Sequence, residues 1–102
     1  MDFIDVAGAS GAAYRFRRWP GADRHPPTAG NYVLVAERDR EILAVGMLED
    51  LSRAPHQVAV PKGAVLLTRL NIARRTREAE HLDLAAAHPV AERHRVGEPQ
   101  MA

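Results

Sequence analysis

Four arginine side chains gather around the start of the longest expected helix: Arg69, Arg74, Arg75 and Arg77. Arginine carries a planar fork of donors that binds phosphate or carboxylate groups through paired hydrogen bonds. Positive charge at a helix N-terminus is mildly unfavourable, by about 0.3–1 kcal/mol. Helix formation therefore does not explain the cluster, and a binding role is a candidate explanation. The cluster indicates a surface that contacts the phosphates of a nucleic acid. The alternative explanation is composition. Lys62 is the only lysine in the chain, so nearly every basic position is an arginine and a cluster of arginines can arise without a binding role.

Histidines form the second group that could do chemistry. His81 and His88 are seven residues apart, two helical turns, and so share a helix face. With His94 they could bind a transition metal, although surface histidines are the simpler interpretation because no thiol or acidic ligand is closely spaced with them. The chain has no cysteine, which excludes disulfides and thiol catalysis. No serine-histidine-aspartate order, glycine-rich phosphate loop or paired-carboxylate motif stands out.

The elements that would position these side chains are predicted by short apolar runs. Residues 31–36 and 41–46 are rich in β-forming side chains and are separated by a charged turn, which predicts two antiparallel central strands. Residues 63–70 predict a third strand. The expected fold class is therefore α/β (α+β), with a small, mainly antiparallel three-stranded central sheet flanked by helices.

Further elements are predicted on both sides of these strands. Residues 2–17 alternate around a glycine-containing turn, which predicts an N-terminal β-hairpin. Residues 48–54 predict a short helix that ends at Pro55, because the residue before a proline avoids the α conformation. Residues 72–88 predict the main helix from a periodic apolar stripe, with Asn71 as its N-cap.

Length and composition predict one domain. The chain has 102 residues, and we expect a single domain at residues 1–89 and a flexible tail at residues 90–102, which lack periodic apolar side chains. The first residues do not resemble a signal peptide, and no run approaches the roughly 20 apolar residues of a membrane span, so we expect a cytoplasmic protein without membrane contact. The formal net charge of +1 gives no attraction of the whole molecule for nucleic acid.

Two tripeptides on the central strands, Gly30-Asn31-Tyr32 and Ala44-Val45-Gly46, precede the short helix. Their order and spacing resemble the opening of a GIY-YIG nuclease domain of the short bacterial type, and the resemblance covers most of residues 1–89. It implies that Tyr32 lies at the active cleft, that Arg53 faces the phosphate and that His56 stands just beyond. It also implies that Glu80, nine residues before Pro89, is a Mg²⁺ ligand.

The chain departs from the family pattern at several positions. Ala44 replaces the second-motif tyrosine, Arg53 comes one residue early, and no asparagine follows Pro89. The resemblance therefore implies a catalytically impaired GIY-YIG-like domain that binds a nucleic acid or a protein and requires no cofactor. The alternative is an active Mg²⁺-dependent endonuclease that cleaves DNA phosphodiester bonds with Tyr32, Arg53, His56 and Glu80.

The expected partner is DNA or another nucleic acid, contacted by the four arginines. A protein partner is the alternative, and it would be held by the loop that carries Trp19, Pro20, Pro26 and Pro27, since tryptophan is enriched at interface hot spots. Trp19 could instead cover the core beneath this loop. The sequence leaves the oligomeric state open.

Overall fold

A computed structural model describes residues 1–89 and 91–94 of the chain, and these residues form a small α+β fold. Its strands form one sheet in the order β1-β2-β5-β3-β4-β6. The strands are β1 (Phe3–Ala7), β2 (Ala13–Arg18), β3 (Gly30–Ala36), β4 (Ile42–Leu48), β5 (Ala64–Leu70) and β6 (Glu92–His94). The helices are the 3₁₀-helix η1 (Leu51–Arg53) and the α-helices α1 (Ala54–Gln57) and α2 (Arg74–Ala87).

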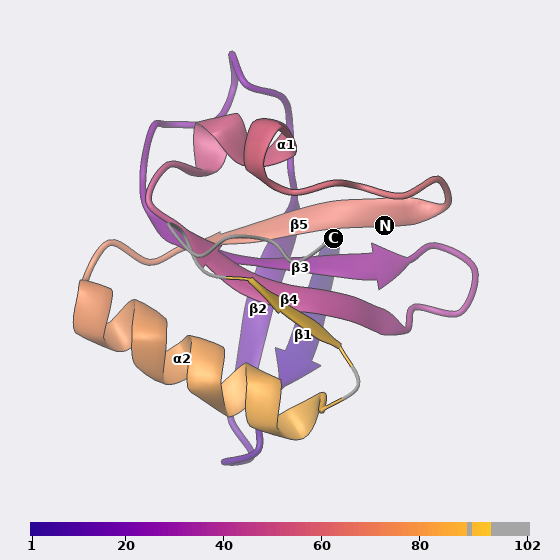
Figure 1. Cartoon of the computed structure of the whole chain (residues 1–102), viewed down its shortest axis with the longest axis vertical. Coiled ribbons are helices and arrows are strands. Elements are labelled where there is room, and N and C mark those ends of the chain that lie inside the picture. Colours follow the sequence, from indigo (N-terminus) through magenta and orange to yellow (C-terminus); the bar gives the residue numbers. More distant parts are fainter. Residues whose placement is uncertain (90, 95–102) are drawn as a thin grey trace.

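The central strands β4, β3 and β5 pair antiparallel, as the sequence predicts. β3 is bonded on both sides and covered on both faces, which explains why all its residues except Ala36 are buried and most of its side chains are apolar. The sheet is larger than the expected three strands, however. The N-terminal hairpin joins it through Arg17 and Arg18, which pair with Thr68 and Leu67 of β5. In Figure 1 the hairpin runs across the central strands, behind them.

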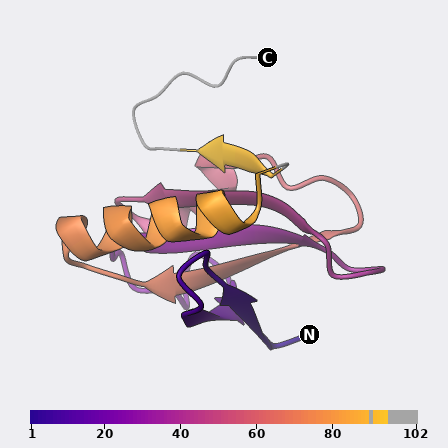
Figure 2. The ribbon, with the colours of Figure 1, turned by 90° about the horizontal axis from the view of Figure 1, so that it is seen from below.

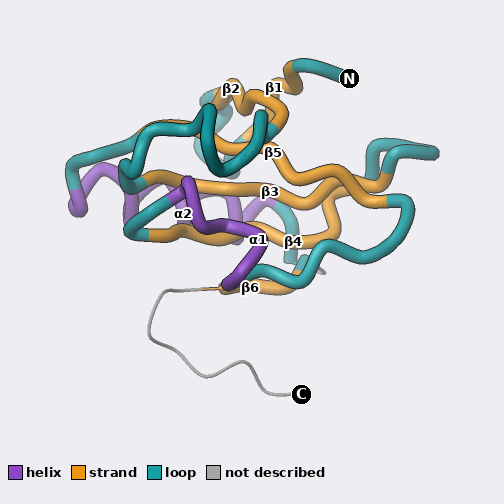
Figure 3. The backbone as a smooth tube through the Cα atoms, turned by 90° about the horizontal axis from the view of Figure 1, so that it is seen from above, coloured by secondary structure: helices purple, strands orange, loops and turns teal. Residues whose placement is uncertain are grey.

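Helices cover the two faces of the sheet, with α1 above the central strands and α2 below them in Figure 1. Viewed from above, α1 lies in front of the strands (Figure 3). Alternate residues of each strand point to opposite faces. Thus Val33 and Val45 pack with Leu84 of α2, whereas Tyr32 and Ala44 pack on the other face with the η1–α1 segment.

The short helix differs from its prediction. β4 continues to Leu48, and Asp50 then caps η1 by accepting a hydrogen bond from the Ser52 amide at 3.0 Å. Pro55 does not end a helix but occupies the first turn of α1. Proline is tolerated there because the first amides of a helix have no partner inside it.

The main helix begins two residues later than expected, with Ala73 in the N-cap position in place of Asn71. The Asn71 side chain is used elsewhere, because its Nδ2 donates to Oδ1 of Asn31 at 2.9 Å. Asn31 in turn donates from its Nδ2 to the Arg77 carbonyl at 3.0 Å. These bonds fix the start of α2 against the central strand.

The C-terminal strand β6 pairs parallel with β4 (Figure 2). It falls within the expected tail, while residues 90 and 95–102 of that tail lie outside the described residues. No helix in the described part of the chain is long and apolar enough to cross a membrane.

Candidate functional site

Tyr32 is fully buried, with no exposed side-chain surface. It lies on the α1 face of the sheet, directly opposite Gly46 in the β3–β4 ladder. A Cβ atom on Gly46 would overlap the Tyr32 ring, and one on Gly30 would overlap the Arg69 carbonyl and the Leu51 side chain. The glycines of both motif-like tripeptides are therefore explained by close packing.

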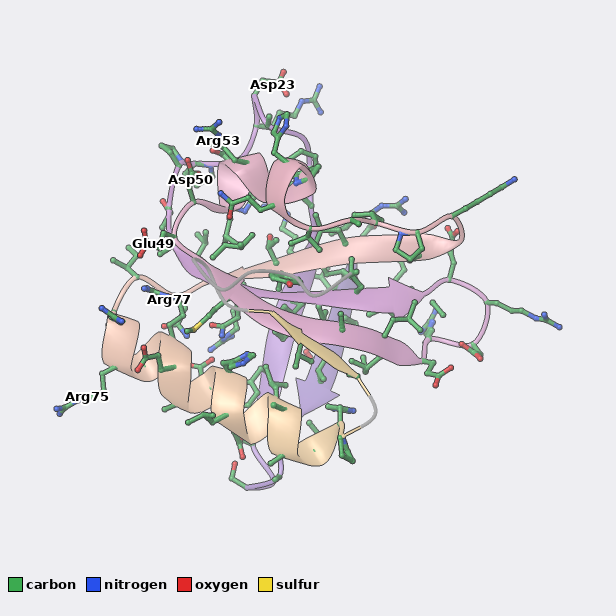
Figure 4. The ribbon with its side chains drawn as sticks, viewed as in Figure 1. Asp23, Glu49, Asp50, Arg53, Arg75 and Arg77 are labelled. Atoms are coloured by element: carbon green, nitrogen blue, oxygen red, sulfur yellow. The ribbon has the colours of Figure 1, made fainter. Side chains whose placement is uncertain are left out.

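Arg53 and His56 are exposed residues of η1 and α1, on the same side of the sheet as Tyr32. Figure 4 shows Arg53 beside Asp50 at the η1 end of the molecule. The two side chains face solvent, whereas the Tyr32 side chain faces the core. The structure thus brings Tyr32 and Arg53 to one side of the sheet but does not expose them in a common cleft.

Glu80 lies on α2 and therefore on the other side of the sheet from Tyr32. Its Oε1 accepts a hydrogen bond from Nε of Arg69 at 2.8 Å, and the Glu80 side chain is only 13% exposed. The Arg69 guanidinium also lies 5.5 Å from the centre of the Tyr14 ring. The carboxylate expected to bind Mg²⁺ is thus engaged by an arginine. Among the described residues, no three histidine or acidic side chains are grouped closely enough to hold a metal.

The predicted arginine cluster is divided by the fold. Arg77 is buried, and its Nη1 donates to the carbonyls of Asn71 at 3.1 Å and Ile72 at 2.8 Å. Arg74 is exposed and pairs with Glu78 across one helical turn at 3.2 Å. Arg75 points away from the molecule, whereas Arg77 lies against it (Figure 4). With Arg69 bonded to Glu80 and Arg74 paired with Glu78, Arg75 is the exposed member of the cluster that forms no ion pair within the described residues.

Asp83 of α2 joins the helix to the hairpin. Its Oδ2 accepts from the Ser10 hydroxyl at 2.6 Å and from the Tyr14 hydroxyl at 2.7 Å, and its Oδ1 accepts from the Ser10 amide at 2.8 Å. The hydrogen bond from Ser10, followed by that from Tyr14, lowers the pKa of Asp83. The same contact with Asp83 raises the pKa of Tyr14. These bonds hold the hairpin turn against α2.

A groove of about 290 Å³ lies between the hairpin, β5 and the proline-containing loop. We call it the arginine groove because its basic lining residues are Arg15, Arg17, Arg24, His25 and Arg69. Its apolar lining residues are Phe3, Pro20, Pro26 and Leu70. No acidic residue of the described chain lines the groove.

The basic residues of the arginine groove are only partly neutralised. Arg15 pairs with Asp5 at 2.9 Å in an exposed contact, and Arg69 pairs with Glu80. Within residues 1–89, neither Arg17 nor Arg24 forms an ion pair. The groove therefore carries excess positive charge beside the exposed Phe3 ring, which is 57% accessible.

Strand pairing explains how the groove is built. Phe3 pairs with Arg17, and alternation along β2 sends Tyr14 and Phe16 to the core and Arg15 and Arg17 outward. This alternation is visible in the sequence, but it does not reveal that the loop comes to lie beside β2. His25 fixes the loop, since its Nε2 lies 3.1 Å from Oγ1 of Thr68 and its Nδ1 lies 2.9 Å from the Pro26 carbonyl.

Comparison with known protein families, curated proteins and solved structures gives no match.

Trp19 makes contacts that stabilise the fold. Its Nε1 donates to the Leu51 carbonyl at 2.8 Å, and its ring packs against the cluster that contains Tyr32. This contact links the proline-containing loop to η1. Trp19 thus helps to cover the core, and its partly buried side chain also lines a second hollow beside β2.

Proposed function

We propose that this chain is a nucleic-acid-binding module with a GIY-YIG-like layout, and that it does not cleave its ligand. The observation that carries the binding role is the arginine groove, a concave site with four arginines and no acidic lining residue in the described chain. Arginine suits this role because its guanidinium binds phosphate oxygens in a bidentate manner.

Local charge supports binding better than net charge does. The whole chain has a formal charge of only +1. Arg17 and Arg24, however, both line the arginine groove, and neither has an acidic partner among residues 1–89. A hollow lined by one sign of charge concentrates its field, because the protein around it has a low dielectric constant. A polyanion would be drawn to this site and not to the molecule as a whole.

The absence of cleavage is supported by the placement of the groups that the family resemblance implies. Tyr32 is buried on one face of the sheet, and Glu80 is bonded to Arg69 on the other. Ala44 supplies only a methyl group where the second tyrosine would stand. The alternative, an active Mg²⁺-dependent endonuclease, would require Glu80 to leave Arg69 and the cleft to be built by other residues.

Binding can be tested by fluorescence anisotropy with labelled oligonucleotides over a range of salt concentrations. Affinity should fall with salt, by about 0.7–0.9 log units per log unit for each phosphate contacted. Arg17→Ala and Arg24→Ala should each weaken binding and reduce that slope by about 1. Arg38→Ala is the matched control, because Arg38 is exposed in the β3–β4 turn, at the far end of these strands from Leu70.

The result of this test distinguishes the arginine groove from the start of α2 as the binding surface. If Arg75→Ala weakens binding while Arg17→Ala does not, the ligand lies at the start of α2 and the arginine groove is the wrong site. No binding even at low salt would reject the binding role. Cleavage of DNA in Mg²⁺ or Mn²⁺ that disappears in Glu80→Ala would instead establish the nuclease alternative.

A further inference from the structure

We infer that the arginine groove takes a single-stranded nucleic acid and stacks an unpaired base on Phe3. This inference rests on the proposed function and specifies the class of ligand. It starts from an exposed aromatic ring in a basic hollow. Single-stranded nucleic acids are generally bound by a positively charged groove that follows the backbone and by aromatic rings that stack on the bases.

Phe3 has the surroundings that such stacking requires. Its side chain is 57% exposed although it is large and apolar. Arg17 is its direct cross-strand neighbour, and the guanidinium carbon of Arg15 lies 6.0 Å from its ring centre. The Arg15 guanidinium therefore lies over the ring and Arg17 projects from the neighbouring strand, so that both cations could contact phosphates next to a stacked base.

The shape of the surface also favours a strand. A second hollow of about 460 Å³ shares Phe3, Arg17 and Pro20 with the arginine groove, and its remaining lining residues are Arg18, Trp19 and the acidic Asp2. The two hollows therefore adjoin at the Phe3–Arg17 pair. Together they form a continuous hollowed surface beside the ring.

A duplex fits this surface less well. Paired bases are stacked inside the double helix and are read by elements that project into its grooves, such as a helix or a two-stranded ribbon. The hairpin of β1 and β2 is such a ribbon, but its turn is tied to α2 by the bonds between Ser10 and Asp83.

The test compares a labelled single strand with the duplex of the same sequence, measured by anisotropy on the full chain. The single strand should bind more tightly. Phe3→Ala should weaken its binding roughly 5- to 150-fold, the range expected for loss of one aromatic–base stack. Phe3→Leu should weaken it similarly, because leucine keeps the apolar character but has no ring, whereas Phe3→Tyr should bind like the wild type.

Ile72→Ala is the matched control, since Ile72 is 76% exposed and lines neither hollow. Circular dichroism and thermal melting check that each variant is folded. If the duplex binds as tightly as the single strand, or if Phe3→Leu binds like the wild type while Arg17→Ala is weakened, the stacking inference is wrong and the proposed function stands. If neither nucleic acid binds at low salt, the proposed function itself fails.

Discussion

The Tyr32 ring covers Gly46, its cross-strand neighbour, so closely that a Cβ atom on Gly46 would overlap the ring. An aromatic side chain laid over a glycine of the adjacent strand compensates for the side chain that glycine lacks. The pair closes the α1 face of the sheet, where Ala44 and Leu51 also pack. Two residues that resemble nuclease motifs are thus a structural pair in this chain.

Gly46→Ala should therefore lower the free energy of unfolding by about 1–3 kcal/mol, the usual cost of overpacking a core. Urea denaturation with an unchanged m-value measures the loss. The double variant Tyr32→Leu/Gly46→Ala should lose less than the sum of its single variants, because leucine leaves room for the methyl group. A Gly46→Ala protein as stable as the wild type would contradict the close contact.

Restoring the family motif by Ala44→Tyr should destabilise the protein and should not create nuclease activity. Ala44 is only 1% exposed and packs with Tyr32 in a closed cluster, so a second phenol has no space there. We expect a loss of at least about 1–3 kcal/mol. Ala44→Ser is the size-matched control. Stable Ala44→Tyr protein that cleaves DNA in Mg²⁺ would show that the motif position is an intact site.

Arg77→Met tests whether this arginine supports the fold. Methionine keeps much of the buried volume but removes the donor that satisfies the Asn71 and Ile72 carbonyls. Hydrogen bonds from charged groups contribute about 1.5–3 kcal/mol each, so stability should fall by roughly 2 kcal/mol or more. Arg75→Met on the exposed side of α2 should change stability little. Equal effects of the two substitutions would refute the structural role of Arg77.

Glu80 should behave as a partner of Arg69 and not as a metal ligand. Glu80→Gln should cost about 1–2 kcal/mol, between the values for exposed and buried ion pairs. Mg²⁺ should leave the melting temperature of the wild type unchanged, because a ligand raises stability only when it binds the folded state. An Mg²⁺-dependent rise in melting temperature that Glu80→Gln abolishes would support the nuclease alternative.

The bond between Asp83 and the hairpin makes stability depend on pH. Hydrogen bonds from Ser10 and Tyr14 lower the pKa of Asp83, so the fold favours the ionised carboxylate. Its contribution is present above the ordinary aspartate pKa of about 3.9 and is lost as the pH falls through the lower pKa of the folded state. Asp83→Asn should therefore be less stable than the wild type at neutral pH, with a smaller difference in acid.

At alkaline pH, the contribution of this network to stability changes in the opposite direction with pH. The pKa of Tyr14 is raised chiefly by its hydrogen bond to Asp83, so the fold favours the protonated phenol. Its contribution is present below the ordinary tyrosine pKa of about 10 and is lost as the pH rises through the higher folded value. Tyr14→Phe should remove this alkaline dependence in urea unfolding curves measured across pH. An unchanged profile in both variants would contradict the role of the network.

The sequence by itself determined the central elements of this protein. The apolar runs at residues 31–36 and 41–46 favoured buried central strands, and the short charged turn between them predicted that the two strands are antiparallel neighbours. The alternation of residues 2–17 likewise predicted the N-terminal hairpin. These features are local, since they depend on backbone preference and on the side-chain period of a strand.

Only the tertiary structure decided how distant segments meet. Nothing in the local pattern shows that the hairpin extends the main sheet, that Asp83 reaches Ser10, or that Arg24 of the loop lies near Arg17 of β2. The division of the arginines also came from the fold, because Arg77 is drawn inward by the carbonyls before α2 while Arg75 faces solvent. Such contacts form between residues far apart in the chain, where pairing and packing fix the partners and sequence spacing does not.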